Sequence, residues 1–321
     1  MAKKTKYAVG IDLGGDTIKV GATAKDGRLL FKGVVETRAE EGPSRVVKQI
    51  RKGVAAAVEA CGAKPIGVGV GSPGVVNAEE GIVENPPNLP GWGRIRLASK
   101  IAKKFDLPVF VENDANAAAV GEMTFGAGKE LDSFIMITLG TGVGGGVIMN
   151  RRLLRGEHGG AGEIGHMSVD YDGEPCKCGS RGCVEAYVGR EYLTKRAATR
   201  LADAPDSTIN RLIDGDLEAL TPKVICEAAK TGDPLAKELI EETGRFLGYA
   251  LASAANLLDI PAFVVGGGVA GFGKPLFDAA KAAAKERALI PMKPRLRVRA
   301  AKLKNDAGVK GAAALVFFRG A

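Results

Sequence analysis

Short apolar runs separated by glycine-containing turns open the chain, a pattern typical of antiparallel β-strands. The turns are Gly14-Gly15-Asp16 and Asp26-Gly27. We therefore expect three strands, over residues 7–13, 18–24 and 29–35.

A helical pattern and two further buried runs follow. Apolar positions recur with helical spacing over residues 44–60, and the run at 66–71 is apolar throughout. Residues 108–112 predict another short strand, which ends at the polar pair Asn113-Asp114. An alanine-rich helix is expected to begin there, with Asp114 near its first turn.

The pattern then restarts in the second half of the chain. Two apolar runs, over residues 133–139 and 143–149, are joined by Gly140-Thr141-Gly142 and echo the first hairpin. This repetition predicts a duplicated α/β architecture with a cleft between the copies. The later elements that we expect are a helix over 233–259, strands over 262–265 and 296–300, and a last helix over 309–319.

The length of the chain favours two domains. It has 321 residues, and single hydrophobic cores stop growing at about 250–300 residues. We predict a smaller α/β domain over residues 1–112 and a larger one over 113–302. The last helix, at about 303–321, is expected to pack back on the smaller domain.

Composition and charge exclude several classes of protein. The net charge is +8, but the basic residues are scattered and run no longer than pairs such as Lys103-Lys104, which disfavours a nucleic-acid partner. No run approaches the roughly 20 apolar residues of a membrane span. The basic start, residues 1–7, lacks the apolar stretch of a signal peptide. We therefore expect a cytoplasmic protein whose positive charge suits anionic nucleotides.

Three glycine clusters follow apolar runs, and such clusters can hold a polyphosphate. Glycine lets the main chain approach phosphate closely, and its N–H groups can point at the oxygens. For a single cluster, a tight hairpin turn is the alternative. Asp12 fits a place near Mg²⁺, through water or Lys19, with a turn aspartate as the alternative. The candidate nucleotide-binding residues are Asp12, Gly14, Gly15, Thr17, Lys19, Gly140, Thr141, Gly142, Gly266, Gly267 and Gly268.

A carboxylate at the strand-to-helix junction is the candidate catalytic group. Transfer of a phosphoryl group to an alcohol needs an acceptor for the hydroxyl proton, and Asp114 can supply it. Asn113 beside it can orient a sugar by hydrogen bonds. The alternative is a pair of residues that merely caps the helix.

A compact cluster of thiols and one imidazole predicts a metal site. His166, Cys176, Cys178 and Cys183 form a Cys₃His set, a recognised composition of structural zinc sites. Four protein ligands leave no open position, so the metal would be structural. Unligated thiols in a flexible loop are the alternative.

Several motifs in this order resemble one known family. The sequence is similar to the ROK family of bacterial sugar kinases and repressors, and specifically to its glucokinase branch, along nearly the whole chain. The motifs are Gly10-Ile11-Asp12-Leu13-Gly14-Gly15, Glu112-Asn113-Asp114-Ala115-Asn116, Gly140-Thr141-Gly142-Val143-Gly144-Gly145-Gly146, Gly159-Gly160-Ala161-Gly162-Glu163-Ile164-Gly165-His166, and the cysteine cluster followed by Glu185.

The resemblance implies a fold and a chemistry. The fold would be the two-domain, ribonuclease H-like α/β fold of hexokinase, actin and Hsp70 chaperones, with ATP and sugar in the interdomain cleft. Asp114 would deprotonate the 6-hydroxyl of glucose, with Mg²⁺ on the ATP, a structural Zn²⁺ and a homodimeric assembly. The residues that would hold the sugar are Asn88, Asn113, Glu163, His166 and Glu185.

One residue departs from the family pattern. Threonine usually follows the paired glycines, where this chain has Asp16 and then Thr17. A carboxylate ~5 Å from a phosphate would cost about 3 kcal/mol at an effective dielectric constant near 20. We expect Asp16 to point away from the phosphate.

Three alternative functions stay open at this stage. A sugar-responsive repressor of the same family would carry a helix-turn-helix domain before the first glycine turn, and eleven residues before Asp12 are too few for one. A kinase for N-acetylglucosamine, N-acetylmannosamine or fructose is the second alternative. Ala161-Gly162-Glu163 resembles the glucokinases more than the family's fructokinases, which tend to have proline there. A non-catalytic sugar binder is the third, and the presence of Asp114 disfavours it.

Overall fold

The computed structural model describes residues 5–318 as two compact units. The first unit comprises residues 1–136, 146–162 and 301–321, and the second comprises 137–145 and 163–300. Residues 1–4 and 319–321 lie outside the described part, and with them the first four residues of the basic start and the last residue of the predicted C-terminal helix.

The first unit is built on a five-stranded sheet with the strand order β3-β2-β1-β4-β8. Strands β1, β2 and β3 run antiparallel in succession, whereas β4 lies parallel to β1 and β8 lies parallel to β4. The strands are β1 (Tyr7–Leu13), β2 (Thr17–Ala24), β3 (Leu29–Glu36), β4 (Val68–Ser72) and β8 (Val109–Asn113).

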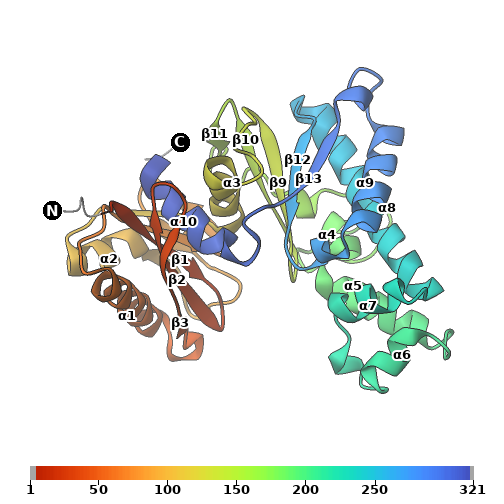
Figure 1. Cartoon of the computed structure of the whole chain (residues 1–321), viewed down its shortest axis with the longest axis horizontal. Helices are drawn as coiled ribbons and strands as arrows, with labels where there is room; N and C mark the ends of the chain where they lie inside the picture. The colour runs from red at the N-terminus through yellow and green to blue at the C-terminus, as the bar shows by residue number, and fades with distance from the viewer. Residues whose placement is uncertain (1–4, 319–321) are drawn as a thin grey trace. The chain divides into compact units, whose positions relative to one another are not determined.

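Helices cover both faces of this sheet (Figure 1). Because side chains alternate along a strand, Val9 and Ile11 pack with α1 and α2 while Ala8 packs with α10 on the other face. This explains why β1 reads as an apolar run without polar alternation. The helices are α1 (Pro43–Cys61), α2 (Leu97–Phe105), α3 (Asp114–Phe125) and α10 (Ala307–Phe318).

The backbone of helix α10 packs in direct contact with the backbone of the sheet and of α3. A Cβ atom at Gly10 would overlap the carbonyl oxygen of Val309, and one at Gly69 would overlap that of Ala312. On the other side of α10, a Cβ atom at Gly121 of α3 would lie 2.7 Å from the Cα atom of Gly311. Glycine is therefore required for this close approach.

A buried carboxylate fixes the segment that leads into α10. Glu122 of α3 has no exposed surface, and it accepts hydrogen bonds from the N–H groups of Ala127, Lys302 and Leu303 at 2.6, 3.2 and 2.8 Å. These bonds satisfy both carboxylate oxygens and tie the returning chain to α3.

The second five-stranded sheet has the order β11-β10-β9-β12-β13, which matches the first sheet position by position. The predicted duplication of the strand–turn–strand unit is therefore confirmed. The strands are β9 (Phe134–Leu139), β10 (Val143–Met149), β11 (Arg152–Leu154), β12 (Ala262–Gly266) and β13 (Arg297–Ala300), and the division between the units falls within β9 and β10.

The second unit is mostly helical, and of its helices the sequence analysis predicts the long one over 233–259. Helices α8 and α9 lie side by side (Figure 1), and a Cβ atom at Gly248 of α8 would lie 2.5 Å from the carbonyl oxygen of Ala280. The helices of this unit are α4 (Val184–Val188), α5 (Arg190–Leu201), α6 (Thr208–Ile213), α7 (Pro222–Lys230), α8 (Pro234–Leu258) and α9 (Lys274–Arg287).

The predicted element boundaries agree with the structure to within about two residues, as local patterns permit. A small sheet with the order β5-β6-β7 was not predicted; its strands are β5 (Val75–Asn77), β6 (Ile82–Glu84) and β7 (Arg94–Arg96). The predicted domains of residues 1–112 and 113–302 divide the chain differently from the compact units, because α3 packs on α10. That domain assignment stays a prediction.

Between residues 5 and 318, no helix combines the length and apolar character needed to cross a bilayer.

The close packing of α10 predicts the effect of one added methyl group. In Gly311→Ala, the new Cβ atom would overlap the carbonyl oxygen of Ala117 in α3. Alanine favours the helix by about 1 kcal/mol, but overpacking costs about 1–3 kcal/mol or more, and the fixed backbone of α3 cannot yield. We expect the free energy of unfolding to fall by about 2 kcal/mol in chemical denaturation.

Gly271→Ala is the matched control, because nothing lies within 4 Å of a Cβ atom there. Its unfolding free energy should stay within about 0.5 kcal/mol of the wild type. Equal stability of the two variants would contradict the backbone-distance packing of α10.

Candidate functional site

The carboxyl ends of three parallel strands bring the predicted polar residues of the first unit to one sheet edge. In register, Asp12 of β1 lies beside Gly71 of β4, and Ser72 of β4 lies beside Asn113 of β8. Ligands of open α/β sheets bind at this kind of edge. The structure therefore gathers Asp12, Asn113 and Asp114, which the sequence places about a hundred positions apart.

Asp12 is held by a lysine and by the start of α10. Its Oδ2 atom lies 3.5 Å from Nζ of Lys19, its antiparallel partner on β2. A Cβ atom at Gly308 would overlap the same carboxylate, so the first turn of α10 closes over Asp12. The carboxylate is 24% exposed, so it keeps contact with solvent while its position is fixed.

The first glycine turn is braced from the end of β3. The Gly14 N–H donates to the Thr17 carbonyl oxygen at 3.0 Å, and the Thr37 hydroxyl donates to the Gly14 carbonyl oxygen at 2.8 Å. A Cβ atom at Gly15 would lie 3.1 Å from Cβ of Asn88. This contact brings the predicted sugar residue Asn88 to the predicted phosphate turn.

Asp16 and Thr17 are exposed in this turn, and the Asp16 carbonyl oxygen accepts the Thr37 N–H at 2.9 Å. The direction of the Asp16 carboxylate relative to a bound phosphate stays a prediction.

Asn113 caps helix α3. Its Oδ1 atom accepts the N–H groups of Ala115 and Asn116 at 2.9 and 3.2 Å, and its Nδ2 atom donates to the Gly74 carbonyl oxygen at 3.3 Å. The capping interpretation is therefore correct for this residue. Its predicted contact with a sugar stays a prediction.

Asp114 is the first residue of α3 and is exposed at the sheet edge. Its Oδ1 atom accepts the Ala115 N–H at 2.8 Å. A carboxylate at a helix N-terminus is stabilised in its charged form by the helix dipole and the N–H groups of the first turn. Asp114 therefore combines exposure with a fixed direction, which a proton acceptor requires.

Sequence reasoning missed a buried ion pair beneath this junction. Glu112 is 3% exposed, and its Oε2 atom accepts a hydrogen bond from Nε of Arg155 at 2.8 Å. The available signal was a glutamate at the end of a buried strand, because a buried carboxylate requires a partner.

In the second unit, the turn Gly140-Thr141-Gly142 meets the N-terminus of α5. The carbonyl oxygens of Gly140 and Thr141 accept the N–H groups of Arg190 and Glu191 at 3.0 and 3.5 Å, and the Thr141 hydroxyl accepts from Nη2 of Arg190 at 3.0 Å. The hydrogen bonds of its carbonyl groups to the start of α5 therefore fix the conformation of this turn.

Glu185 links this turn to the cysteine cluster. Its Oε2 atom accepts the Val143 N–H at 2.9 Å, and its Oε1 atom lies 4.0 Å from Sγ of Cys176. A Cβ atom at Gly142 would lie 2.2 Å from Oε2 of Glu185, so the carboxylate packs directly against the backbone of the glycine turn.

The third glycine cluster ends strand β12. Gly267 has a φ angle of 95° and packs on the carbonyl group of Leu139, a conformation and a distance that only glycine accepts. Gly267 and Gly268 are exposed, and Gly268 precedes a short 3₁₀ helix, η4 (Val269–Phe272).

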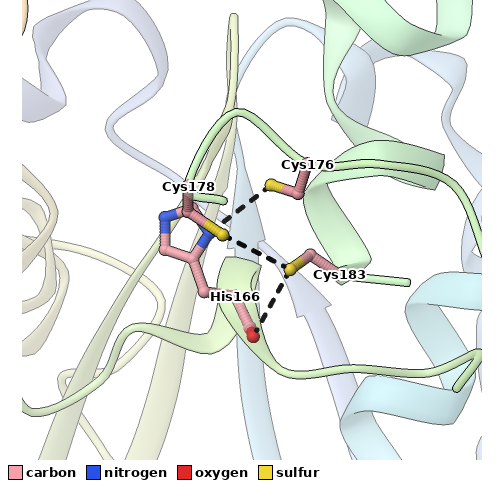
Figure 2. Close-up of side chains that lie close together, drawn as sticks. All are labelled: His166, Cys176, Cys178 and Cys183. Atoms are coloured by element: carbon pink, nitrogen blue, oxygen red, sulfur yellow. Dashed lines mark hydrogen bonds between the residues drawn. The ribbon is translucent and has the colours of Figure 1, made fainter. Parts of the chain in front are cut away.

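Four side chains converge as the sequence predicts for a metal site (Figure 2). The ligand atoms of His166, Cys176, Cys178 and Cys183 lie within 4.8 Å of one another. Nδ1 of His166 lies 3.8 Å from Sγ of Cys176, and the Sγ atoms of Cys178 and Cys183 are 3.7 Å apart. Zinc at about 2.3 Å from sulfur and about 2.0 Å from nitrogen places neighbouring ligand atoms about 3.5–3.8 Å apart in a tetrahedron. The donor set and its spacing therefore fit a four-coordinate metal ion.

The loop that carries the thiols is closed by its own backbone. The Cys176 N–H donates to the Ser180 carbonyl oxygen at 2.8 Å, and the Gly179 N–H donates to the Cys176 carbonyl oxygen at 3.0 Å. A hydrogen bond from the Ser180 backbone lowers the pKa of the Cys178 thiol, whereas burial raises the pKa of Cys183 to about 12. A metal ion would have to displace the proton of Cys183, so metal binding would release protons.

His166 and Glu163 come from one short 3₁₀ turn, η2 (Ile164–His166), which Glu163 precedes. Both side chains are exposed, and a Cβ atom at Gly165 would overlap the carbonyl oxygen of Val143. The turn thus packs on Val143 at the start of β10, the same residue whose N–H binds Glu185.

The predicted site residues consequently form two sets, each held within one unit. The first unit holds Asp12, Gly14, Gly15, Thr17, Lys19, Asn88, Asn113 and Asp114. The second unit holds Gly140, Thr141, Gly142, Glu163, His166, Cys176, Cys178, Cys183, Glu185, Gly266, Gly267 and Gly268.

Comparison with known proteins places these features in a family. The sequence matches the ROK family over residues 8–318. A glucokinase of Streptomyces coelicolor is 39% identical over 313 residues, and one of Thermotoga maritima is 34% identical over 308 residues; each alignment covers 96% of both chains.

A solved structure gives the same result. A ROK family glucokinase from Streptomyces griseus, in complex with glucose and AMPPNP, superposes with a TM-score of 0.84 at 39% identity, covering 96% of this chain and 98% of that one. This likeness confirms the predicted α/β fold class of hexokinase and actin. Because the match extends over nearly the whole sequence, this chain belongs to the ROK family.

Proposed function

We propose that this chain is a glucokinase, which transfers the γ-phosphoryl group of ATP to the 6-hydroxyl of glucose, with Asp114 as the general base. The observation that carries the proposal is the position of Asp114, exposed in the first turn of α3 at the carboxyl end of the parallel strands. The relatives named glucokinase, at 34–39% identity, support the choice of substrate and donor.

The proposed mechanism uses the residues of the first unit for proton transfer. As the 6-oxygen of glucose attacks the γ-phosphate, Asp114 accepts the hydroxyl proton, and the Ala115 N–H bound to Oδ1 holds the carboxylate in a defined direction. Mg²⁺ bound to the ATP would neutralise charge on the phosphate oxygens, and Asp12 with Lys19 is the pair that would face it.

The remaining site residues are proposed to hold the two substrates. The three glycine clusters, with Thr17 and Thr141, would bind the nucleotide. Asn88, Asn113, Glu163, His166 and Glu185 would bind the hydroxyl groups of the sugar. Glu185 supports this assignment by contacting both the glycine turn and the cysteine cluster.

The metal is proposed to be a structural Zn²⁺. His166, Cys176, Cys178 and Cys183 would supply all four ligands of a tetrahedral ion. The ion would then fix the wall that carries His166 and Glu185 and would take no part in the chemistry. A homodimer is proposed from the family resemblance alone, and sedimentation would test it. A cytoplasmic location is proposed from the sequence pattern, which has neither a signal-peptide stretch nor a membrane-spanning run.

A conservative substitution tests the role of Asp114. Asp114→Asn keeps an oxygen for the Ala115 N–H but cannot accept the proton, so we expect kcat to fall by about 10²–10⁴-fold. Glucose binding, measured by calorimetry, should be preserved. Asp132→Asn, at an exposed position of the same unit, is the control and should keep wild-type turnover. Near-normal turnover of Asp114→Asn with glucose would contradict the assignment of the base.

The metal assignment predicts a change in zinc content. Cys178→Ser removes one of the four ligands, so zinc per chain, measured by elemental analysis, should fall well below the stoichiometric value of the wild type. Cys226→Ser is the matched control, because Cys226 lies in α7, outside the cluster. Equal zinc content in both variants would show that Cys178 does not bind the ion.

A further inference from the structure

The carboxylate of Glu112 is buried directly before the predicted catalytic pair, and both of its oxygens are bound. Oε1 accepts the Asn113 N–H at 3.0 Å and Nδ2 of Asn116 at 3.1 Å. Oε2 accepts Nε of Arg155 at 2.8 Å. A buried carboxylate is tolerated only when it is paired in this way, so its position is strongly determined.

The two bonds at Oε1 hold the chain on both sides of Asp114. The Asn113 N–H belongs to the peptide before the helix, and Asn116 lies in the first turn of α3, two residues after Asp114. The orientation of this turn, and with it the direction of the Asp114 carboxylate, therefore depends on where the Glu112 carboxylate sits.

Arg155 is the cation that fixes Glu112, and its own place is fixed by a closed loop. The carbonyl oxygen of Arg155 accepts the Ala161 N–H at 3.0 Å. Within this loop, Gly159 has a φ angle of 81°, and a Cβ atom there would lie 2.5 Å from the carbonyl oxygen of Val76 in β5. The loop is thus docked on the small sheet, and it holds the guanidinium against the carboxylate.

We propose that Arg155 is a positioning residue for the phosphoryl transfer: through Glu112 it holds the first turn of α3 so that Asp114 meets the attacking hydroxyl. The inference rests on the proposed function. In this proposal Arg155 acts through its hydrogen bond to Glu112 and not by binding the sugar or the nucleotide. Its contribution belongs to kcat, because a base displaced by about 1 Å costs up to about 10²-fold in rate.

The surroundings of Glu112 and Arg155 indicate that the fold tolerates the loss of the Arg155 guanidinium. Glu112 and Arg155 both line a cavity of about 400 Å³. When the guanidinium is removed, water can enter from this cavity and hydrate the carboxylate, so the charge is not left unsolvated. The carboxylate then loses a directional partner and the α3 turn loses its constraint.

The test compares Arg155→Met with Arg152→Met. Arg152 is an exposed arginine on the same hairpin, in β11, so the two variants lose the same charge. For Arg155→Met we expect kcat with glucose and MgATP to fall about 10- to 100-fold with little change in the KM for glucose. Zinc content and circular dichroism should match the wild type. Arg152→Met should keep the wild-type kcat.

Two further variants separate positioning from general structure. Arg155→Lys keeps the cation and should recover much of the lost kcat, although it lacks the planar fork of arginine. In Glu112→Gln, the partner of Arg155 is already altered. If Arg155 acts only through Glu112, adding Arg155→Met to Glu112→Gln should cause little further loss, so the two effects should not add.

Several results would overturn the inference. These are a kcat of Arg155→Met within twofold of Arg152→Met, a raised KM at unchanged kcat, a lysine variant no faster than the methionine variant, or fully additive losses in the double variant. Each would leave the proposed function intact, since the wild type stays active. A wild type that phosphorylates no hexose would instead refute the proposed function, and the inference would fall with it.

Discussion

The first unit depends on the contact of α10 with the backbone of β1, β4 and α3. Gly10, Gly69 and Gly311 let this helix approach at distances that a methyl group would forbid. The last helix of the chain thereby lies on the first sheet, opposite the face that α1 and α2 cover. The same approach places Gly308 against the Asp12 carboxylate, so the packing of the core and the position of a predicted site residue have one cause.

Helix α3 converts this packing into a defined arrangement of charges. One buried glutamate lies before its first turn and another in its last. Glu112 binds Arg155 and the N-terminal turn, whereas Glu122 accepts three N–H groups, two of them from the segment that leads into α10. Because a buried carboxylate must be satisfied, each fixes its neighbours. Asp114 remains exposed on a helix that is held at both ends, which is the arrangement expected of a pre-organised proton acceptor.

Much of the fold could be predicted because its signals are local. Glycine turns and apolar runs predicted every strand of the two large sheets except the three-residue β11, and Pro43 and Pro234 mark helix starts. The Cys₃His cluster could be predicted because its ligands lie within 18 consecutive positions, from His166 to Cys183.

Contacts between distant residues could not be predicted. Glu112 and Arg155 are 43 positions apart, Glu185 and Val143 are 42 apart, and Glu122 and Leu303 are 181 apart. The three-residue strands of the small sheet are too short to show an alternation of apolar and polar residues. Asn113 caps helix α3, so its position in the sequence does not by itself indicate a role in binding.

The central claim is that this ROK family chain phosphorylates glucose, and a panel of sugars tests it most directly. Glucose, N-acetylglucosamine, N-acetylmannosamine, mannose and fructose would each be assayed with MgATP by coupled measurement of ADP release. The account predicts that glucose has the highest kcat/KM. A higher value for an N-acetyl sugar would contradict the assignment of glucose while preserving a kinase, and the absence of turnover with every sugar would contradict the catalytic function itself.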